Sequence, residues 1–446
     1  MHFPARFAAC ILLLLIGSRQ LRAQNFTFTT LAGSTTSGTN DGPNASAQFD
    51  FPGGIAVDNQ GNLFVGDTSN NTIRKITPVG DDWVVTTIAG VPGFGAIGNT
   101  NDGPMPIGRL YRPDGVVADT NGNVFVVDHN NDTIRQLTLN GTNWLLSTIA
   151  GWGGDKGYAD GTNSDARFFG PTGIAIDRVG NLYVGDTATF TVRKLAQIGS
   201  NWVVTTIAGL GTNFGFADGT NGDARFSSPF GLAVDANTNI FVADFGNHAI
   251  RKIRPVGTNW VTTTIAGNGN MGSADGTNSQ ARFNFPADVT LDKDGNLYVS
   301  DQSNNTIRKM TPVGTNWVVT TIGGVALVQG TNNGLGTNAH FFRPWGLAMD
   351  GQGRLFIVDH SNNSIREGVP PSNAVPTLRI ARVGPNVLLS WPLAASRFVV
   401  ESSSTPSTGA SWTRLTNGIV ISGNYFWLTN NANSSQVFYR LHGSGP

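Results

Sequence analysis

Short apolar runs alternate with turn-forming residues, and one arrangement of four such runs recurs along the chain. In its first copy, apolar runs at residues 54–58 and 63–67 flank a turn at residues 59–62 that contains Gly and Asn. Two runs of strand length joined by such a turn are typical of a β-hairpin. A third strand is predicted at residues 73–76 and a fourth at residues 83–88.

A proline opens each copy and fixes the period of the repeat. Successive prolines are spaced by 61, 58, 58, 57 and 58 residues, and they are Pro52, Pro113, Pro171, Pro229, Pro286 and Pro344. Six copies of a unit with four short strands indicate a ring of blades, each blade being one small sheet. The sequence therefore predicts an all-β fold whose main part is a six-bladed β-propeller.

The sixth copy lacks its fourth strand, because residues 364–366 run directly into a linker that contains Pro370. Residues 26–33 match residues 83–90, with Phe26 in the place of a Trp. We expect this N-terminal strand to complete the sixth blade and close the ring, which removes exposed strand edges. The Trp residues of the fourth strands are predicted to pack between blades, with carbohydrate stacking as the alternative; they are Trp83, Trp144, Trp202, Trp260 and Trp317.

The repeated unit resembles the NHL repeat. The matching residues read Pro-x-Gly-Ile-Ala-Val-Asp, then Gly-Asn-Leu-Tyr-Val-x-Asp and Asn-x-x-Ile-Arg-Lys, the last two seen in full at residues 295–301 and 304–309. The resemblance covers residues 24–368 and implies the same six-bladed propeller. It says little about activity, because propellers include binding modules and several unrelated enzymes.

The N-terminus has the pattern of a secretory signal peptide. Arg6 precedes an apolar run at residues 7–17, and a small-residue site ends at Ala23, after which we expect cleavage. The apolar run is too short to span a bilayer, so no transmembrane span is expected in the mature chain. Cys10 lies before the apolar core rather than at the cleavage site, which argues against a lipid anchor. We expect a secreted, periplasmic or cell-envelope protein without disulfides.

Composition narrows the choice of partners. The 446 residues include 29 basic and 29 acidic ones, and only 13% are charged. A balanced charge gives no field that attracts nucleic acid or an anionic membrane, so neither is expected as a partner. The 57 Gly residues would suit either a disordered repeat or a turn-rich β protein, and the regular period favours the second.

A long loop joins the fourth strand of each copy to the first strand of the next. Strand alternation places these loops on the same rim as the turns between second and third strands. This rim is the expected ligand face, since loops on a rigid scaffold commonly carry binding residues. The loops contain an acidic residue before Gly at Asp41, Asp102, Asp160, Asp218 and Asp275, with Asn333 as the departure.

An aspartate ends the second strand of every copy. The set is Asp67, Asp128, Asp186, Asp244, Asp301 and Asp359. Six carboxylates around an axis could bind calcium, but we predict a structural role in which each accepts backbone N–H groups of the turn that follows. A further hypothesis is that the loop arginines pair with this ring or with the Asp-Gly carboxylates; they are Arg109, Arg167, Arg225 and Arg282.

The position directly after each repeat proline varies from copy to copy. It holds Gly53, Asp114, Thr172, Phe230, Ala287 and Trp345, and one place further on a Gly is replaced only by Asp288. A purely structural ring should be uniform, so Asp114, Phe230, Asp288 and Trp345 are candidate ligand contacts at the mouth of the channel. Drift on an exposed rim is the alternative explanation.

Histidines at three alternate copies raise the question of zinc. His129 and His360 directly follow a ring aspartate, whereas His248 lies four residues after one, so the three do not occupy equivalent depths. The peptidyl-amidating lyases, which share the propeller fold, hold zinc through His placed just after the strand-opening proline, and no His stands there in this chain. We expect no cofactor, with calcium or zinc as the alternatives, and keep His129 and His360 as tentative ligand contacts.

Residues 377–446 lose the period and follow a linker at residues 369–376. Their short apolar runs resemble a small fibronectin type III or immunoglobulin-like β-sandwich, with Trp391 as its predicted core residue. Such a module would act as a spacer, an adhesion unit or a sorting tail.

The sequence as a whole favours an exported, monomeric, non-enzymatic binding protein for a protein or carbohydrate ligand. The alternative is a propeller lyase or lactonase that uses Asp114, Asp288 or His129 and His360 around the channel. The lactonase-like propellers use acidic residues on the channel, often Glu, and the mature propeller has a Glu only at Glu367. A purely structural envelope component is a third possibility.

Overall fold

The computed structural model describes residues 26–98 and 100–371, together with seven C-terminal segments: 378–383, 386–392, 398–404, 411–415, 419–422, 425–431 and 437–443. The predicted signal peptide at residues 1–23 lies outside the described residues, as does most of the predicted linker. No helix in the described parts is long and apolar enough to cross a membrane.

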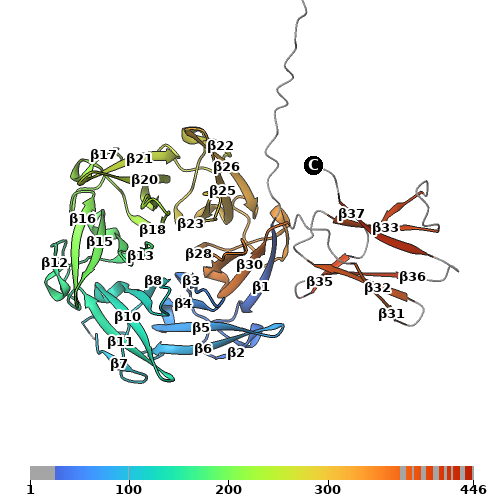
Figure 1. The fold of residues 1–446 in the computed structure, drawn as a ribbon, viewed down its shortest axis with the longest axis horizontal. Coiled ribbons are helices and arrows are strands. Elements are labelled where there is room, and N and C mark those ends of the chain that lie inside the picture. Colours follow the sequence, from blue (N-terminus) through green and yellow to red (C-terminus); the bar gives the residue numbers. More distant parts are fainter. Residues whose placement is uncertain are drawn as a thin grey trace, which may run out of the picture.

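Six antiparallel sheets stand in a ring over the described part of residues 26–371 (Figure 1), which confirms the predicted six-bladed propeller. From the channel outward, the long strands are β3 (Ile55–Val57), β4 (Leu63–Asp67), β5 (Thr72–Val79) and β6 (Asp82–Gly90) in blade 1, and β8 (Pro113–Ala118), β9 (Val124–Asp128), β10 (Thr133–Asn140) and β11 (Asn143–Ala150) in blade 2. They are β13 (Pro171–Ile176), β14 (Leu182–Asp186), β15 (Thr191–Ile198) and β16 (Asn201–Ala208) in blade 3, and β18 (Pro229–Val234), β19 (Ile240–Asp244), β20 (Ala249–Val256) and β21 (Asn259–Ala266) in blade 4. They are β23 (Pro286–Leu291), β24 (Leu297–Asp301), β25 (Thr306–Val313) and β26 (Asn316–Gly323) in blade 5, and β28 (Pro344–Met349), β29 (Leu355–Asp359), β30 (Ser364–Val369) and β1 (Thr27–Gly33) in blade 6.

Each blade has one strand more than the sequence predicts. Before the chain enters the innermost strand, two residues of the long loop pair with the outermost long strand, as Gly42 does with Val85. These edge strands are β2 (Gly42–Pro43), β7 (Gly103–Pro104), β12 (Gly161–Thr162), β17 (Gly219–Thr220), β22 (Gly276–Thr277) and β27 (Gly334–Leu335). The Asp-Gly segments therefore run along the outer edges of the blades.

The N-terminal strand closes the ring, as predicted. Strand β1 pairs antiparallel with β30, with Thr27 opposite Val369, and lies between β30 and β27 in the sheet of blade 6. The side chains of Phe26 and Phe28 are fully buried. Blade 6 is thus built from both ends of the propeller sequence.

Aromatic contacts join neighbouring blades at the outer strands. The Trp83 ring in blade 1 lies 6.0 Å from that of Phe356 in blade 6, edge to face. Phe26 makes the corresponding contact with Tyr298 at 5.7 Å, which confirms that it takes the Trp place. The other pairs are Trp144 with Phe64, Trp202 with Phe125, Trp260 with Tyr183 and Trp317 with Phe241. The prediction of packing between blades is confirmed.

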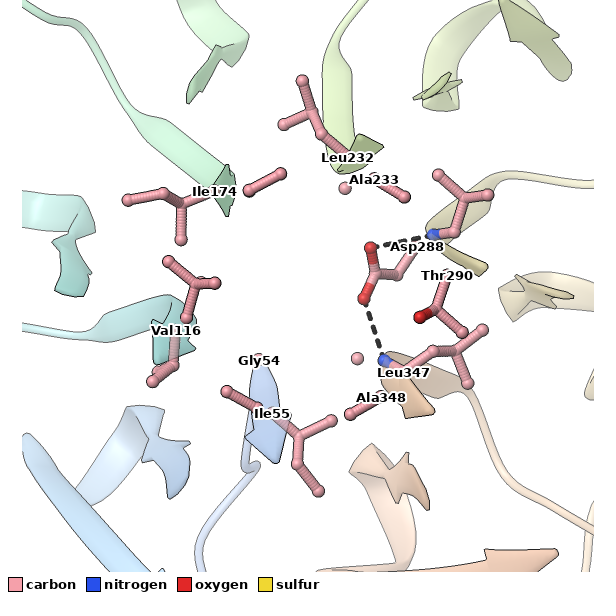
Figure 2. Close-up of a pocket in the computed structure, with 18 of the residues that line it drawn as sticks. Gly54, Ile55, Val116, Ile174, Leu232, Ala233, Asp288, Thr290, Leu347 and Ala348 are labelled. Atoms are coloured by element: carbon pink, nitrogen blue, oxygen red, sulfur yellow. Dashed lines mark hydrogen bonds between the residues drawn. The ribbon is translucent and has the colours of Figure 1, made fainter. Parts of the chain in front are cut away.

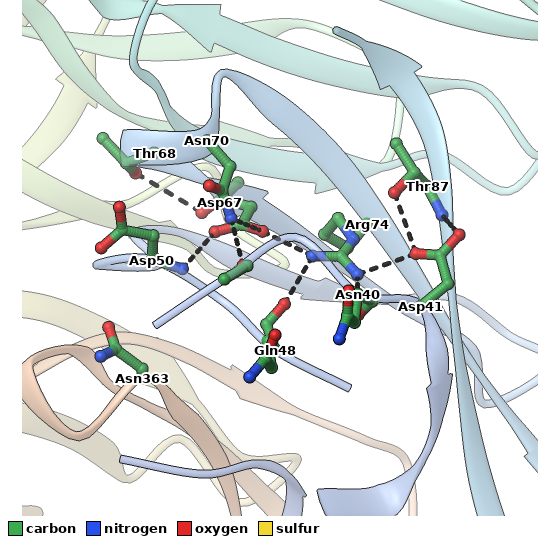
Figure 3. Close-up of polar contacts among 12 residues, drawn as sticks. Asn40, Asp41, Gln48, Asp50, Asp67, Thr68, Asn70, Arg74, Thr87 and Asn363 are labelled. Carbon is green, nitrogen blue, oxygen red and sulfur yellow. Dashed lines mark hydrogen bonds and ion pairs between the residues drawn. The ribbon is translucent and has the colours of Figure 1, made fainter. Parts of the chain in front are cut away.

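A buried arginine anchors the long loop to each blade, and Figure 3 shows the contacts of Arg74 in blade 1. In blade 1, Nη1 of Arg74 lies 2.6 Å from Oδ2 of the ring carboxylate Asp67, and Nη2 lies 2.8 Å from Oδ1 of Asp41. Asp67 also accepts the Asp50 N–H at 2.8 Å and an N–H of the Asn70 amide at 2.9 Å. The pairing of arginine with ring aspartate recurs at Arg135, Arg193, Arg251, Arg308 and Arg366. Blade 6 has Asn333 in place of the loop aspartate, and blade 3 has Thr189 in place of the asparagine.

Two parts of the sequence interpretation need correction here. The backbone N–H that each ring aspartate accepts comes from a residue 17 positions earlier, not from the turn that follows. The hypothesis that the loop arginines pair with the ring or with the Asp-Gly carboxylates is wrong. The guanidiniums donate to backbone carbonyl oxygens of their own loops: Arg109 to Pro106, Arg167 to Ser164, Arg225 to Gly222 and Arg282 to Ser279. Arg167 also forms an ion pair with Asp155.

The described strands between residues 378 and 443 form a small β-sandwich. One sheet has the order β31-β32-β36-β35 and the other β34-β33-β37. Trp391 is buried at their core, as predicted, beside Leu389 and Val400. The strands are β31 (Arg379–Val383), β32 (Asn386–Pro392), β33 (Phe398–Ser403), β34 (Thr413–Leu415), β35 (Ile419–Ser422), β36 (Tyr425–Asn431) and β37 (Phe438–Gly443).

Candidate functional site

The innermost strands of the six blades enclose a central channel with a cavity of about 260 Å³. Figure 2 shows Ile55, Val116, Ile174 and Leu232 around it, with the carboxylate of Asp288 projecting inward. Small and branched apolar side chains make up most of the wall. Among the lining side chains, Asp114, Thr172, Asp288 and Thr290 are polar, so the channel presents both apolar and polar surface.

The glycines after the strand-opening prolines let neighbouring blades touch through their backbones. A Cβ on Gly115 would lie 2.4 Å from the carbonyl oxygen of Thr172, and a Cβ on Gly173 would lie 2.3 Å from that of Phe230. Real side chains do not come so close to backbone atoms. The uniform Gly of the repeat is therefore a packing requirement.

Asp288 is the exception in that ring, and its carboxylate is held by backbone groups. Oδ1 accepts the Val289 N–H and Oδ2 accepts the Leu347 N–H of blade 6, both at 2.8 Å. Its own N–H donates to Oγ of Ser300, 2.9 Å away on the paired strand. Burial raises the pKa of Asp288 to about 7, against the lowering effect of the two N–H groups.

Trp345 and Asp114 meet at the mouth of the channel. The indole Nε1 of Trp345 donates to Oδ1 of Asp114 at 3.3 Å, and its ring lies 5.4 Å from that of Phe230. One side chain of blade 6 thus touches blades 2 and 4. Burial raises the pKa of Asp114 to about 6, while His129, the Trp345 hydrogen bond and Arg112 lower it.

Aromatic rings continue on both sides of Trp345. His360 stacks on Trp345 at 4.7 Å and contacts Phe51 at 5.2 Å. On the other side, Phe230 stacks on Phe245 at 4.5 Å. The candidate residues Trp345, Phe230 and His360 therefore form one aromatic surface at the channel mouth.

The three histidines each bind the next blade rather than one another. Nδ1 of His129 lies 2.8 Å from the carbonyl oxygen of Pro171, and Nδ1 of His360 lies 2.8 Å from that of Pro52. Thr68 and Thr187 make the same link in other blades through their hydroxyls. Nδ1 of His248 instead accepts the Phe285 N–H at 3.1 Å.

The three histidines therefore connect neighbouring blades through hydrogen bonds. Burial lowers the pKa of His248, and it lowers that of His360 to about 4. Throughout the parts of the chain that the structure describes, no three His, Cys, Asp or Glu side chains are grouped so that they could hold a metal ion.

The long loops between blades carry exposed aromatic side chains. We call the rim formed by residues 91–112, 151–170, 209–228, 267–285 and 324–343, with the equivalent residues 34–51, the loop face. Of the described propeller, every aromatic side chain at least 38% exposed lies there; the set is Phe51, Phe94, Trp152, Tyr158, Phe169, Phe214 and Phe216. Ile97, Leu210, Met271 and Leu327 are exposed beside them.

The sequence interpretation located this face but none of its aromatic residues. They stand in loop segments whose sequences differ from copy to copy, so the repeat pattern gave them no weight. A search for large apolar residues within the polar, Gly-rich loops would have found them.

Comparisons with known proteins match the repeats. The family described as "Teneurin NHL domain" matches residues 218–370, and the family described as "NHL repeat" matches residues 49–76. The chain is 27% identical over 310 residues to NHL repeat-containing protein 2 of Bos taurus, covering 62% of this chain and 41% of that protein. It is 27% identical over 236 residues to Teneurin-1 of Homo sapiens, covering 48% and 8%. The chain spans less than half the length of these relatives.

Solved structures share the architecture. A Bacteroides thetaiotaomicron protein of unknown function has a TM-score of 0.58 at 22% identity, over 77% of this chain and 75% of that one. An auxiliary nutrient binding protein of Bacteroides ovatus has a TM-score of 0.57 at 17% identity, over 78% of each chain. At these identities the likeness concerns the fold.

Proposed function

Taking the chain as an NHL-type propeller, we propose that it is an exported binding protein that holds a ligand against its loop face. The observation that carries this proposal is the concentration of exposed aromatic side chains on that one rim. Trp152 and Phe214 are 58% and 68% exposed, although such rings usually bury most of their surface. Exposed aromatic groups gathered on one face are typical of an interaction site.

The chemistry of the loop face favours a protein over a glycan. Phe, Trp, Tyr, Met and Arg are enriched at protein interfaces, whereas Lys, Glu, Asp, Ser and Ala are depleted. The Asp, Ser and Ala residues of the loop face belong mostly to the repeated loop motif, so the comparison rests on the residues that vary between copies. The loop face presents these enriched types and aliphatic side chains such as Leu327, contains Lys156 as its one lysine, and has no Glu. The exposed aliphatic side chains beside the rings, such as Ile97 and Leu210, suit the apolar core of a protein interface.

The frame beneath the loops suits such a role. Each long loop is tied to its blade by a buried arginine, as Arg193 is to Asp160 and Asp186. Because the loops are already ordered, little conformational entropy is lost when they bind. At the centre of the face, the surface formed by Asp114, Phe230 and Trp345 is proposed to contact the ligand, together with His129, His360 and Asp288. The C-terminal sandwich is proposed to act as a spacer or attachment module.

One observation favours an enzyme as the second candidate. Asp114 and Asp288 line the same channel, and burial raises their pKa values to about 6 and about 7. Carboxyls that titrate near neutral pH are suited to general acid and base catalysis. A lyase or lactonase of this kind would lose its activity in both Asp114→Asn and Asp288→Asn variants, whereas a binding protein would retain its ligand in at least one.

The binding proposal is tested by screening the mature chain against a displayed library of extracellular protein fragments and against a glycan array. We expect a protein fragment that binds the wild type and loses at least about tenfold in affinity with the triple variant Phe94→Ala, Trp152→Ala, Phe214→Ala. The matched control, Leu139→Ala with Ile198→Ala, removes exposed apolar side chains from the opposite rim and should leave binding unchanged. Binding to glycans alone, or equal losses in both variants, would contradict the proposal.

A further inference from the structure

The residues before the strand-opening prolines form a second ring around the channel mouth, and the sequence interpretation gave them no role. Each has a positive φ, for example 43° at Phe51 and 53° at Arg112 and Arg343. The others are Gly170, Ser228 and Phe285. The same unusual backbone conformation at every blade places these residues at equivalent points of the ring.

Side chains of the preceding blades fix this backbone in the sector of interest. The N–H groups of Phe51 and Arg112 donate to the side-chain oxygens of Asn363 and Asn71, both at 2.8 Å. The N–H of Arg343 donates to Oδ1 of Asn305 at 2.9 Å. The backbone positions of Arg112 and Arg343 are therefore fixed before a ligand binds.

Two arginines flank one aromatic residue in this ring. Blades 6, 1 and 2 are consecutive, and they contribute Arg343, Phe51 and Arg112 in that order. Both arginine side chains are exposed, and within the described residues neither guanidinium has a hydrogen bond or an ion pair. The three equivalent positions of blades 3 to 5 are uncharged, so both arginines of this ring lie on one side of the mouth.

A stacked aromatic surface lies beside these arginines. Phe51 contacts His360, which stacks on Trp345. Burial lowers the pKa of His360, and Arg343 and Arg112 lower it further, so both guanidiniums lie within electrostatic range of the same ring. The imidazole is neutral at pH 7 and leaves the two arginines as the cations of this sector.

We propose that Arg343, Phe51 and Arg112 form an anchor for a carboxylate that sits next to an apolar group of a protein ligand. This inference rests on the proposed binding of a protein to the loop face and names the group recognised at its centre. A guanidinium presents two parallel N–H donors that match a carboxylate, and the adjacent rings would exclude water from the pair. The charged hydrogen bonds would then be strong.

A single negative charge fits this sector better than a double one. Burial raises the pKa values of Asp50 and Asp114, and the charge of Arg112 offsets part of that rise in both carboxyls. Asp50 is part of the same rim and would repel the second charge of a phosphate monoester. A carboxylate carries only one charge and would therefore meet less repulsion from Asp50.

The test uses the full mature chain and two probes that differ only in charge, N-acetyl-phenylalanine and its amide, titrated by NMR. We expect the acid to bind at least about tenfold more tightly than the amide, because hydrogen bonds to charged groups are the stronger ones. Arg112→Gln with Arg343→Gln should remove this preference. The control Arg178→Gln changes an exposed arginine on the opposite rim and should retain it.

Equal binding of acid and amide, or an unchanged preference in the double variant, would overturn the anchor. So would tighter binding of glucuronate than of N-acetyl-phenylalanine, since that result points to an acidic sugar. The outcome is separable from that of the proposed function. A selected protein fragment that ignores the double arginine variant would contradict the anchor alone, whereas acid-selective binding with no protein ligand would contradict the proposed function alone.

Discussion

The indole N–H of Trp345 in blade 6 donates to the carboxylate of Asp114 in blade 2, so a single hydrogen bond joins two blades that are not neighbours in the ring. Trp345 is the largest of the side chains that line the channel. The contact links two residues that are 231 positions apart in the chain.

Replacing Trp345 by Phe removes this bond while keeping an aromatic ring. We expect the free energy of unfolding to fall by about 1 kcal/mol, the usual value of one such bond. The pKa of Asp114 should rise above about 6, because the indole N–H lowers it. Denaturant unfolding and a carboxyl NMR titration check both results. Trp152→Phe on the exposed loop is the control, and equal effects of the two variants would contradict this role.

The buried arginines predict a large difference between their two acidic partners. Arg193→Gln leaves Asp186 fully buried without its cation, and we expect a loss of about 3–5 kcal/mol in the free energy of unfolding. Asp160→Asn should cost less than about 1 kcal/mol, because that side chain is about half exposed.

The sixth blade supplies a natural control for this comparison. Asn333 stands in the Asp160 place, and its Oδ1 accepts the Arg366 guanidinium at 2.9 Å. Chemical unfolding measures both variants. Similar losses for Arg193→Gln and Asp160→Asn would show that the buried half of the network is not the dominant one.

Asp288 should make folding stability depend on pH. Burial raises its pKa from the ordinary 3.8 to about 7, so the folded state binds a proton that the unfolded state has released between these values. The contribution to stability is therefore full below about pH 4 and is lost as the pH rises to about 7. Asp288→Asn removes this dependence, so the wild type should become less stable relative to the variant over that window. Asp223→Asn, at an exposed loop position, should show no such trend.

His248 should act in the opposite direction. Burial lowers its pKa below the ordinary 6.5, so its contribution to stability is present above pH 6.5 and is lost as the pH falls below it. Other blades use Asn71, Asn305 or Asn363 at this place, so His248→Asn should fold normally and resist acid better. His248→Phe removes the acceptor of the Phe285 N–H, and blade 3 carries Phe190 at this place with the same positive φ. This variant should cost about 1–3 kcal/mol at pH 7. Melting curves between pH 4.5 and 8 distinguish these outcomes.

The periodic parts of the fold could be predicted from the sequence because each repeat contains the local apolar runs and turns that define its strands. The proline period, the Trp at the outer strand and the match of Phe26 to that Trp were enough to predict the blades and the closing strand. The edge strands were missed because two residues, such as Gly42 and Pro43, carry no periodicity.

The buried arginines were missed for a different reason. Arg74 belongs to the repeated Ile-Arg-Lys motif, but an arginine in a strand is normally exposed, so its burial contradicts the usual expectation. Its presence in all six copies was the available signal. At the site, the sequence placed Trp345 and Asp114 at the channel mouth but could not show that they touch, since nothing local connects residues so far apart.

The pairing of β1 with β30 also orders the folding of the propeller. Thr27 pairs with Val369, so the contact that closes the ring joins residues with one of the longest sequence separations in the molecule. Closing so long a loop is entropically costly and raises the contact order, which slows folding. The first five blades can form from contacts between residues near in sequence. Blade 6 can be completed only when both ends of the propeller sequence are present.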